Sequence, residues 1–171
     1  MTTNGRLEVL LLEAEGIKDR DKCLVGCLNW VNPCRLAAKP YVRIQYENQE
    51  HTSSVGKGRG EKRQWNEKFT FDVNYPAGDG REDHVYKLVL HIMDKHKYNQ
   101  DEPVGQTTVY IKDILSLGAE KGKLEVEPRV YRIVESDKSY TGQISIALTF
   151  LKGEDETQGD IGGWKESDVQ E

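Results

Sequence analysis

The chain of 171 residues has a modest apolar share of 36% and a formal net charge of −5, which suits one soluble domain with its own core and argues against a generally basic nucleic-acid-binding protein. No apolar run approaches the roughly 18 residues of a membrane span. The N-terminal stretch MTTNGRLEVLLLEAEG lacks a basic region and a cleavage site, so we expect a strand there and not a signal peptide. Three cysteines, an odd number, fit a reducing cytoplasmic compartment.

Alternation of apolar and polar residues predicts the strands in chain order. Residues 6–14 (RLEVLLLEA) place Leu7, Val9 and Leu11 on one side, and residues 40–46 (PYVRIQY) repeat the pattern. Further strands are expected at residues 51–55, 68–73, 85–93, 104–111, 128–134 and 143–151. Eight strands separated by turns favour an all-β fold, an eight-stranded antiparallel β-sandwich. The sequence IKDILSLG at 111–118 predicts one short surface helix, which Gly118 can end.

The C-terminal segment differs in composition from the rest of the chain. Residues 152–171 carry far more acidic than basic side chains and few apolar ones. Such a segment cannot offset the entropy cost of ordering itself. We therefore expect one domain at residues 1–151 and an acidic flexible tail at residues 152–171.

Five motifs in chain order resemble the successive signatures of a C2 domain: GRLEVLLLEAEGIKDRD, KPYVRIQY, RQWNEKFTF, LHIMDKHKYNQDEPVG and GQISIALTF. WNEKFTFDVNYPAG, PRVYRIV and GGWKES are most similar to the small single-domain C2 proteins of plants, the phloem protein and elicitor-responsive group. The resemblance implies type II topology, in which the last strand fills the place of a strand missing at the N-terminus. It also implies a phospholipid-binding module in plant signalling, defence response or phloem trafficking.

In the family, function lies in loops at one end of the sandwich, which correspond here to residues 18–39, 56–67 and 94–102. Calcium-binding members place about five aspartates on the first and third loops, because Ca²⁺ takes roughly six to eight oxygen ligands. Carried over one at a time, these positions hold Asp21, Lys39, Asp94, His96 and Glu102. Since Lys39 and His96 replace two ligands and add positive charge, the resemblance implies a degenerate metal site of Asp21, Asp94 and Glu102, with weak or absent Ca²⁺ binding.

Lysine and arginine give these three loops a net positive charge in a chain that is otherwise acidic. Such a division indicates one positive end that faces an anionic surface. The expected anion-binding and membrane-binding residues are Lys22, Arg35, Lys39, Lys57, Arg59, Lys62, Arg63, Lys95 and Lys97. For a single loop such as GKGRGEKR, ordinary surface charge is the alternative interpretation. GKGRG itself is interpreted as a turn and not as a phosphate-binding glycine loop, since no strand and helix flank it.

The first loop, extended over about residues 22–38, is unusually apolar for an exposed segment and includes Leu28, Trp30 and three cysteines. Three interpretations stay open. The loop folds back as a lid, it is a tolerated insertion, or it dips Trp30 and Leu28 into a bilayer interface, where tryptophan is common. The cysteine spacing is a weak zinc signal, and reduced thiols are the better interpretation.

No motif places a serine or cysteine beside a histidine and an acid, so we expect no enzyme and no catalytic residue. Trp65 is expected to have a structural role under the loops. We predict a cytoplasmic monomer that associates peripherally with the plasma membrane through anionic phospholipids. Two alternatives are an RNA-binding protein of the phloem type that moves between cells, and a protein-interaction adaptor. An RNA site would add exposed aromatic side chains for base stacking.

Overall fold

The computed structural model describes residues 2–18, 38–76, 86–96 and 100–153. Within these ranges the chain forms eight strands and one helix. They are β1 (Thr2–Glu15), β2 (Pro40–Tyr46), β3 (Gln49–Thr52), β4 (Arg63–Pro76), β5 (Lys87–Asp94), β6 (Glu102–Tyr110), α1 (Lys112–Lys121), β7 (Lys123–Val134) and β8 (Tyr140–Lys152). In this part of the chain no helix has the length and apolar character that a membrane crossing needs.

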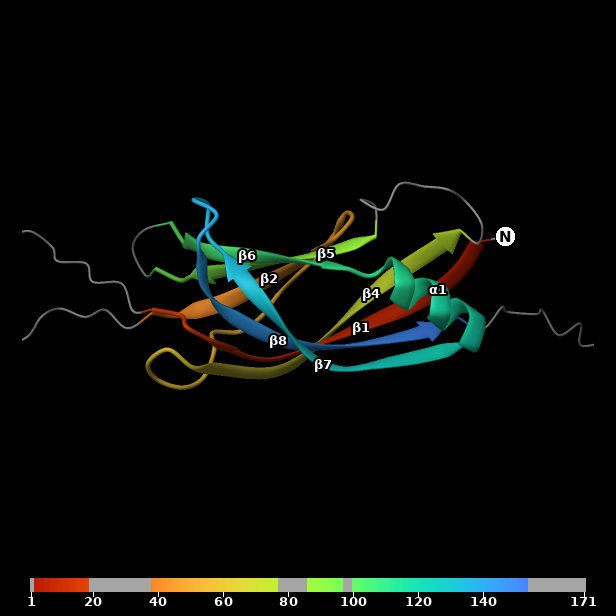
Figure 1. Cartoon of the computed structure of the whole chain (residues 1–171), viewed down its shortest axis with the longest axis horizontal. Coiled ribbons are helices and arrows are strands. Elements are labelled where there is room, and N and C mark those ends of the chain that lie inside the picture. The colour runs from red at the N-terminus through yellow and green to blue at the C-terminus, as the bar shows by residue number, and fades with distance from the viewer. Residues whose placement is uncertain (1, 19–37, 77–85, 97–99, 154–171) are drawn as a thin grey trace, which may run out of the picture.

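The strands form a two-layered antiparallel sandwich. In Figure 1 the layer of β2, β5 and β6 lies above the layer of β4, β1, β8 and β7, and β3 pairs with β2. Among the described residues, β6 and β7 pair at a single position, Gln106 with Val134. The two layers of the sandwich therefore meet at this position and diverge beyond it. β8 pairs with β7 on one side and with β1 on the other. This position confirms the predicted placement of the last strand.

Strand alternation builds the core as the sequence predicts. Leu7, Val9 and Leu11 of β1 are completely buried, and Val42 and Ile44 of β2 face them across the sandwich with no exposed surface. A β-bulge between Leu11 and Glu13 shifts the register of β1 against both of its neighbours. A bulge adds a residue to one strand, and Ala14 beyond it is again buried.

β5 positions the candidate site. Its side chains alternate strictly, so that Leu88, Leu90, Ile92 and Asp94 all point inward. Because side chains of a strand face one side at every second residue, Asp94 is the last member of an apolar row. The strand therefore delivers a buried carboxylate to the end of the sandwich where the loops lie.

The helix differs from its prediction. α1 does not end at Gly118 but runs on to Lys121, and Gly122 caps it with a φ of 83°. Gly118 lies inside the helix and is buried, because a Cβ at this position would overlap the Phe150 ring. The residue that sequence analysis interpreted as a stop signal is thus a contact that lets α1 approach β8.

Candidate functional site

The described bases of the three loops lie at one end of the molecule, the left end in Figure 1. Backbone hydrogen bonds join them at their bases. Ile17 N donates to Glu61 O at 3.2 Å, and Lys95 N donates to Lys39 O at 3.0 Å. Gly56 N also donates to Pro40 O at 2.7 Å. Segments far apart in the sequence are therefore held side by side at this end.

Two of the predicted ligand residues, Asp94 and Glu102, lie opposite each other in the register of β5 and β6. Asp94 is buried, with 5% of its surface exposed. Its Oδ1 accepts a hydrogen bond of 2.9 Å from the backbone N–H of Lys39, whose side chain is exposed. The fold thus brings the backbone of Lys39 beside Asp94 and places Glu102 opposite Asp94 on the neighbouring strand.

The side chain of His96 lies between these carboxylates. Its Nε2 atom is 3.9 Å from Asp94 Oδ2 and 3.7 Å from Glu102 Oε2. This nitrogen is buried and, within the described residues, has no hydrogen-bond partner. The imidazole stands in the space where an ion bridging Asp94 and Glu102 would sit.

Asp101 has a role that sequence analysis missed. Its Oδ2 accepts a hydrogen bond of 2.5 Å from the Tyr41 hydroxyl, and its Oδ1 accepts one of 3.1 Å from the backbone N–H of His96. The Tyr41 hydrogen bond is the main cause that lowers the pKa of Asp101, and the His96 N–H adds to it. Burial, followed by the bond to Asp101, raises the pKa of Tyr41. Asp101 stands directly before Glu102 and Tyr41 directly after Pro40, but no local pattern in the sequence indicates that these two side chains meet.

The described part of this site does not fit a calcium ion. Calcium needs several free oxygens around a common centre, whereas here an imidazole separates Asp94 from Glu102, and both oxygens of Asp101 are engaged elsewhere. Among the residues that the structure describes, no group of three or more His, Cys, Asp or Glu side chains is arranged to hold a metal.

In the loop between β3 and β4, some basic side chains face solvent and others bind neighbouring groups of the protein. Lys57 and Arg59 are exposed. Lys62 lies 3.4 Å from both Glu13 and Glu15. The buried Arg63 donates from Nη1 to Gly58 O at 2.8 Å and from Nε to Gly60 O at 3.2 Å.

The contacts of Arg63 hold the turn in shape from below. Gly58 and Gly60 have φ values of 119° and 70°, which only glycine adopts without strain. Trp65, whose indole N–H donates to Ser54 O at 2.9 Å, is buried beside Gly56. The structural role predicted for Trp65 is therefore confirmed. In this loop, Lys57 and Arg59 are the basic residues whose side chains face solvent without an ion pair to another described residue.

Several predicted site residues lie outside the described ranges. They are Asp21, Lys22, Leu28, Trp30, Arg35 and Lys97. Lys39 and Lys95 are described, and both are exposed at the base of the loops. Of the predicted anion-binding residues that the structure describes, Lys39, Lys57, Arg59 and Lys95 are exposed without an ion pair to another described residue.

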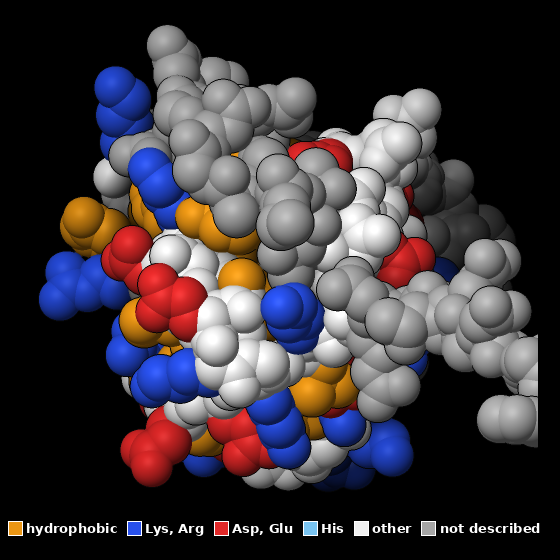
Figure 2. Space-filling model, turned by 90° about the vertical axis from the view of Figure 1, so that its right-hand side faces the viewer, with side chains coloured by type: hydrophobic (Ala, Val, Ile, Leu, Met, Phe, Trp, Pro, Cys, Tyr) orange, Lys and Arg blue, Asp and Glu red, His pale blue; other side chains and the backbone are white. Residues whose placement is uncertain are grey.

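The opposite end of the molecule has a different character. Figure 2 shows that lysine, arginine, aspartate and glutamate side chains are intermixed on the described part of that end, around α1. Lys123 and Glu125 form one of its ion pairs, at 2.7 Å. Neighbouring charges of opposite sign neutralise each other's field, so this end is a poor candidate for an anionic surface.

Residues 5–126 match the model of the C2 domain family. The chain belongs to the C2 family. C2 domains are commonly associated with membranes and phospholipids. The match ends within β7, and β8 completes the same sandwich by pairing with β7 on one side and with β1 on the other.

Two curated relatives align with this C2 protein over nearly its whole length. Elicitor-responsive protein 1 of Oryza sativa subsp. japonica is 35% identical over 170 residues, which is 98% of this chain and 98% of that protein. The 16 kDa phloem protein 1 of Arabidopsis thaliana is 36% identical over 170 residues, or 96% of this chain and 97% of that protein. The similarity to the phloem and elicitor-responsive group is therefore confirmed.

Solved structures agree. A C2 domain-containing protein from a putative elicitor-responsive gene superposes with a TM-score of 0.60 at 29% identity, over 90% of this chain and 93% of that one. A C2 domain of plant Extended Synaptotagmin 1 gives a TM-score of 0.58 over 87% of this chain and 95% of that one. At 15% identity, the second similarity shows the shared fold alone.

Proposed function

We propose that this C2 protein is a non-enzymatic module that docks on anionic phospholipid membranes through its loop end, with weak or absent dependence on Ca²⁺. The observation that carries the proposal is the combination of Lys39, Lys57, Arg59 and Lys95 exposed around one end with His96 between the carboxylates. Positive charge that calcium would supply in a calcium-dependent relative is here part of the protein. We propose the plasma membrane as the docking surface, because its cytoplasmic leaflet carries anionic lipids.

Charge alone supports only weak docking. Each basic residue near an anionic surface contributes about 1 kcal/mol, so four of them give about 4 kcal/mol, which corresponds to about millimolar affinity. Burying an apolar side chain adds roughly 1.5 to 3 kcal/mol. Leu28 and Trp30 of the first loop are the residues we propose for this contact, on the basis of their sequence. Two such contacts would bring the affinity toward micromolar.

The test is sedimentation with phosphatidylserine vesicles, with Ca²⁺ and with a chelator. The variant Lys57→Glu with Arg59→Glu replaces attraction by repulsion at two positions, a change of about 4 kcal/mol and roughly a thousandfold in affinity. The matched control, Lys87→Glu with Lys152→Glu, changes the net charge equally, and both lysines are exposed at the opposite end. We expect the loop variant to lose binding and the control to keep most of it.

Two results would contradict the proposal: equal losses in the loop variant and the control, or binding that appears only when Ca²⁺ is added. Single-stranded RNA added as a competitor distinguishes RNA binding from lipid binding at this end. RNA that displaces the protein from vesicles must bind the same basic end.

For the first loop, Trp30→Ala with Leu28→Ala should weaken vesicle binding without lowering the melting temperature. A lower melting temperature with unchanged binding of the folded protein would indicate a packed lid.

A further inference from the structure

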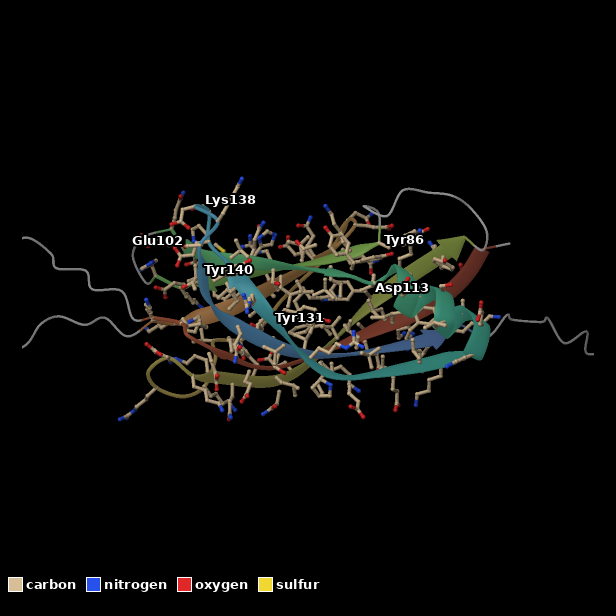
Figure 3. The ribbon with its side chains drawn as sticks, viewed as in Figure 1. Tyr86, Glu102, Asp113, Tyr131, Lys138 and Tyr140 are labelled. Carbon is tan, nitrogen blue, oxygen red and sulfur yellow. The ribbon has the colours of Figure 1, made fainter. Side chains whose placement is uncertain are left out.

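The outward face of the lower layer of the sandwich carries an apolar strip, which comprises Leu10, Leu12, Pro128, Val130 and Ala147. Cross-strand pairing places Leu10 of β1 beside Ala147 of β8, and Ala147 lies opposite the bulge of β7 that contains Pro128. In the next row Ser145 of β8 pairs with Val130, which is 58% exposed. Figure 3 shows this face as the lower side of the molecule, with no described helix or strand beneath it.

The sequence of β1 indicates that this face is covered in the folded chain. Antiparallel strands with one face in water alternate apolar and polar side chains, whereas strands buried on both faces have continuous apolar runs. Residues 9–12 of β1 read VLLL. Val9 and Leu11 are completely buried in the core, while Leu10 and Leu12 are half-buried. The run therefore belongs to a strand with apolar contacts on both faces, and its outward contact is missing from the described residues.

Arginine side chains border the strip on β7. Arg129 and Arg132 lie on either side of Val130 in the sequence, and both are exposed without an ion pair to another described residue. The Arg132 guanidinium lies 5.2 Å from the centroid of the exposed Tyr140 ring. Since opposite charges across an interface favour the correct partner, these arginines favour an acidic one.

The acids of β1 near the strip do not cancel this charge, because they already have lysine partners at 3.4 Å: Glu8 with Lys68, and Glu13 and Glu15 with Lys62.

The segment that follows β8 has the matching composition. Residues 154–171 carry seven acidic side chains and one lysine, and they include Ile161 and Trp164. A segment of this composition cannot order by itself. Contact with an existing apolar surface supplies the burial that it lacks, since one aromatic side chain buries roughly 150 to 250 Å². Glu166 and Asp168 follow Trp164 closely, so a tryptophan placed on the strip brings two carboxylates toward the arginines of β7.

The segment also starts close enough to reach the strip. β8 ends beside α1, at the right-hand end in Figure 1, and the backbone N–H of Gly153 donates to Asn4 O at 2.7 Å. From Gly153 back to Ala147 the distance along β8 is about 20 Å, at roughly 3.3 Å per residue. The residues between Gly153 and Trp164 span up to about 36 Å when extended. The chain can therefore reverse its direction and still lay Trp164 on the strip.

We propose that residues 154–171 fold back on the outward face of this layer, with the Trp164 indole on the apolar strip and Glu166 and Asp168 beside Arg129 and Arg132. The occupant is the chain's own segment, because a tethered segment has a high effective concentration at a surface within its reach. The contact lies on the sheet face and uses none of the basic residues assigned to membrane docking.

Nuclear magnetic resonance of the full chain tests the contact directly. We expect nuclear Overhauser effects between the Trp164 indole protons and the methyl groups of Leu10, Val130 and Ala147. In the variant Trp164→Ala, the backbone amide signals of these three residues should shift. The control Val169→Ala changes an apolar residue near the end of the segment and should leave those signals in place.

Thermal melts of the full chain measure the coupling. Trp164→Ala and Val130→Glu should each lower the melting temperature by about 2 to 6 °C, and the double variant should melt within about 1 °C of the less stable single variant. The two effects overlap because both changes remove the same contact. Tyr110→Glu makes the same charge change at a residue of β6 that is 70% exposed in the other layer, and its effect should add to that of Trp164→Ala.

The expected contacts together with overlapping effects in the melts support the proposal. Additive effects of Trp164→Ala and Val130→Glu, contacts of Trp164 with the loop end, or no contact between Trp164 and the strip overturn it. Contacts that grow with protein concentration, together with a dimer in analytical ultracentrifugation, would show that a second copy supplies the segment, and this also overturns the intramolecular contact. None of these measurements involves a membrane, so their failure is separate from a failure of vesicle docking.

Discussion

Replacing His96 by aspartate should convert the loop end into a calcium site. The substitution removes the imidazole from between Asp94 and Glu102, where its Nε2 is 3.9 and 3.7 Å from the two carboxylates. It places a third carboxylate in the same space. The bond from Lys39 N–H to Asp94 Oδ1 stays, because its donor is a backbone group.

The size of the effect follows from the added charge. One pair of unit charges at about 4 Å is worth roughly 4 kcal/mol at an effective dielectric of 20. Solvent at the loop end reduces this, and about 3 kcal/mol corresponds to a gain of roughly a hundredfold in affinity. A millimolar site would thus become a site of about 10 µM. At about 1 mM Ca²⁺, or about 100 times that dissociation constant, bound calcium stabilises the folded state by about 2.7 kcal/mol.

The assay is thermal unfolding with Ca²⁺ and with a chelator. A stabilisation of about 2.7 kcal/mol raises the melting temperature of a domain of this size by roughly 5 to 10 °C. In chelator, His96→Asp should melt below the unsubstituted protein, because three carboxylates then repel one another. Asn48→Asp is the control, since Asn48 is exposed in the turn after β2 and the change adds the same charge away from the site.

Two results would refute this reasoning. If Ca²⁺ shifts the melting temperatures of His96→Asp and Asn48→Asp equally, the space between Asp94 and Glu102 is not a calcium position. If calorimetry of the unsubstituted protein shows a micromolar calcium site, the imidazole of His96 does not exclude the ion.

Three further predictions concern stability. Gly118→Ala should lower the free energy of unfolding by roughly 1 to 3 kcal/mol in urea denaturation, because the new methyl group overlaps the Phe150 ring; an unchanged midpoint would show that α1 can move away. Burial lowers the pKa of His91, so stability should fall as the pH drops below about 6.5, and His91→Gln should flatten that loss in pH-dependent melts. The hydrogen bond from Tyr41 lowers the pKa of Asp101. The ionised Asp101 carboxylate therefore stabilises the folded state above about pH 4, and this stabilisation is lost as the pH falls further. Asp101→Asn should have a lower melting temperature than the unsubstituted protein at pH 7, and the two melting temperatures should converge in acid.

Local pattern was sufficient to predict the strands but not their ends. The predicted strand at residues 40–46 matches β2, Pro40–Tyr46. The predicted strand at residues 128–134 is only the second half of β7, Lys123–Val134. A bulge between Val126 and Arg129 interrupts the ladder with β8 around Pro128, which hides the earlier half. Proline and bulges break the alternation on which strand prediction depends.

The candidate site was predictable in part for the same reason. Asp94 follows an apolar alternating row, so its place at the end of β5 could be expected from the sequence. The engagement of Asp101 by Tyr41 could not be expected, because the two residues are 60 positions apart in the sequence and meet only when β2 pairs with β5. Lys62 and Arg63 carry charge in the sequence, but their partners come from β1 and from the carbonyl groups of the turn.

The sequence by itself determined the alternating strands and the motifs whose resemblance to the C2 family implies the fold, the place of the last strand and the five positions compared with calcium ligands. These follow from alternation and from motifs that are continuous along the chain. Only the tertiary structure decided that the imidazole of His96 stands between Asp94 and Glu102 and that Lys18 and Lys138, far apart in the sequence, line one groove of about 740 Å³. Such contacts depend on how closely separate backbones approach, and glycines at Gly16, Gly105 and Gly142 permit that approach without marking it in any local pattern.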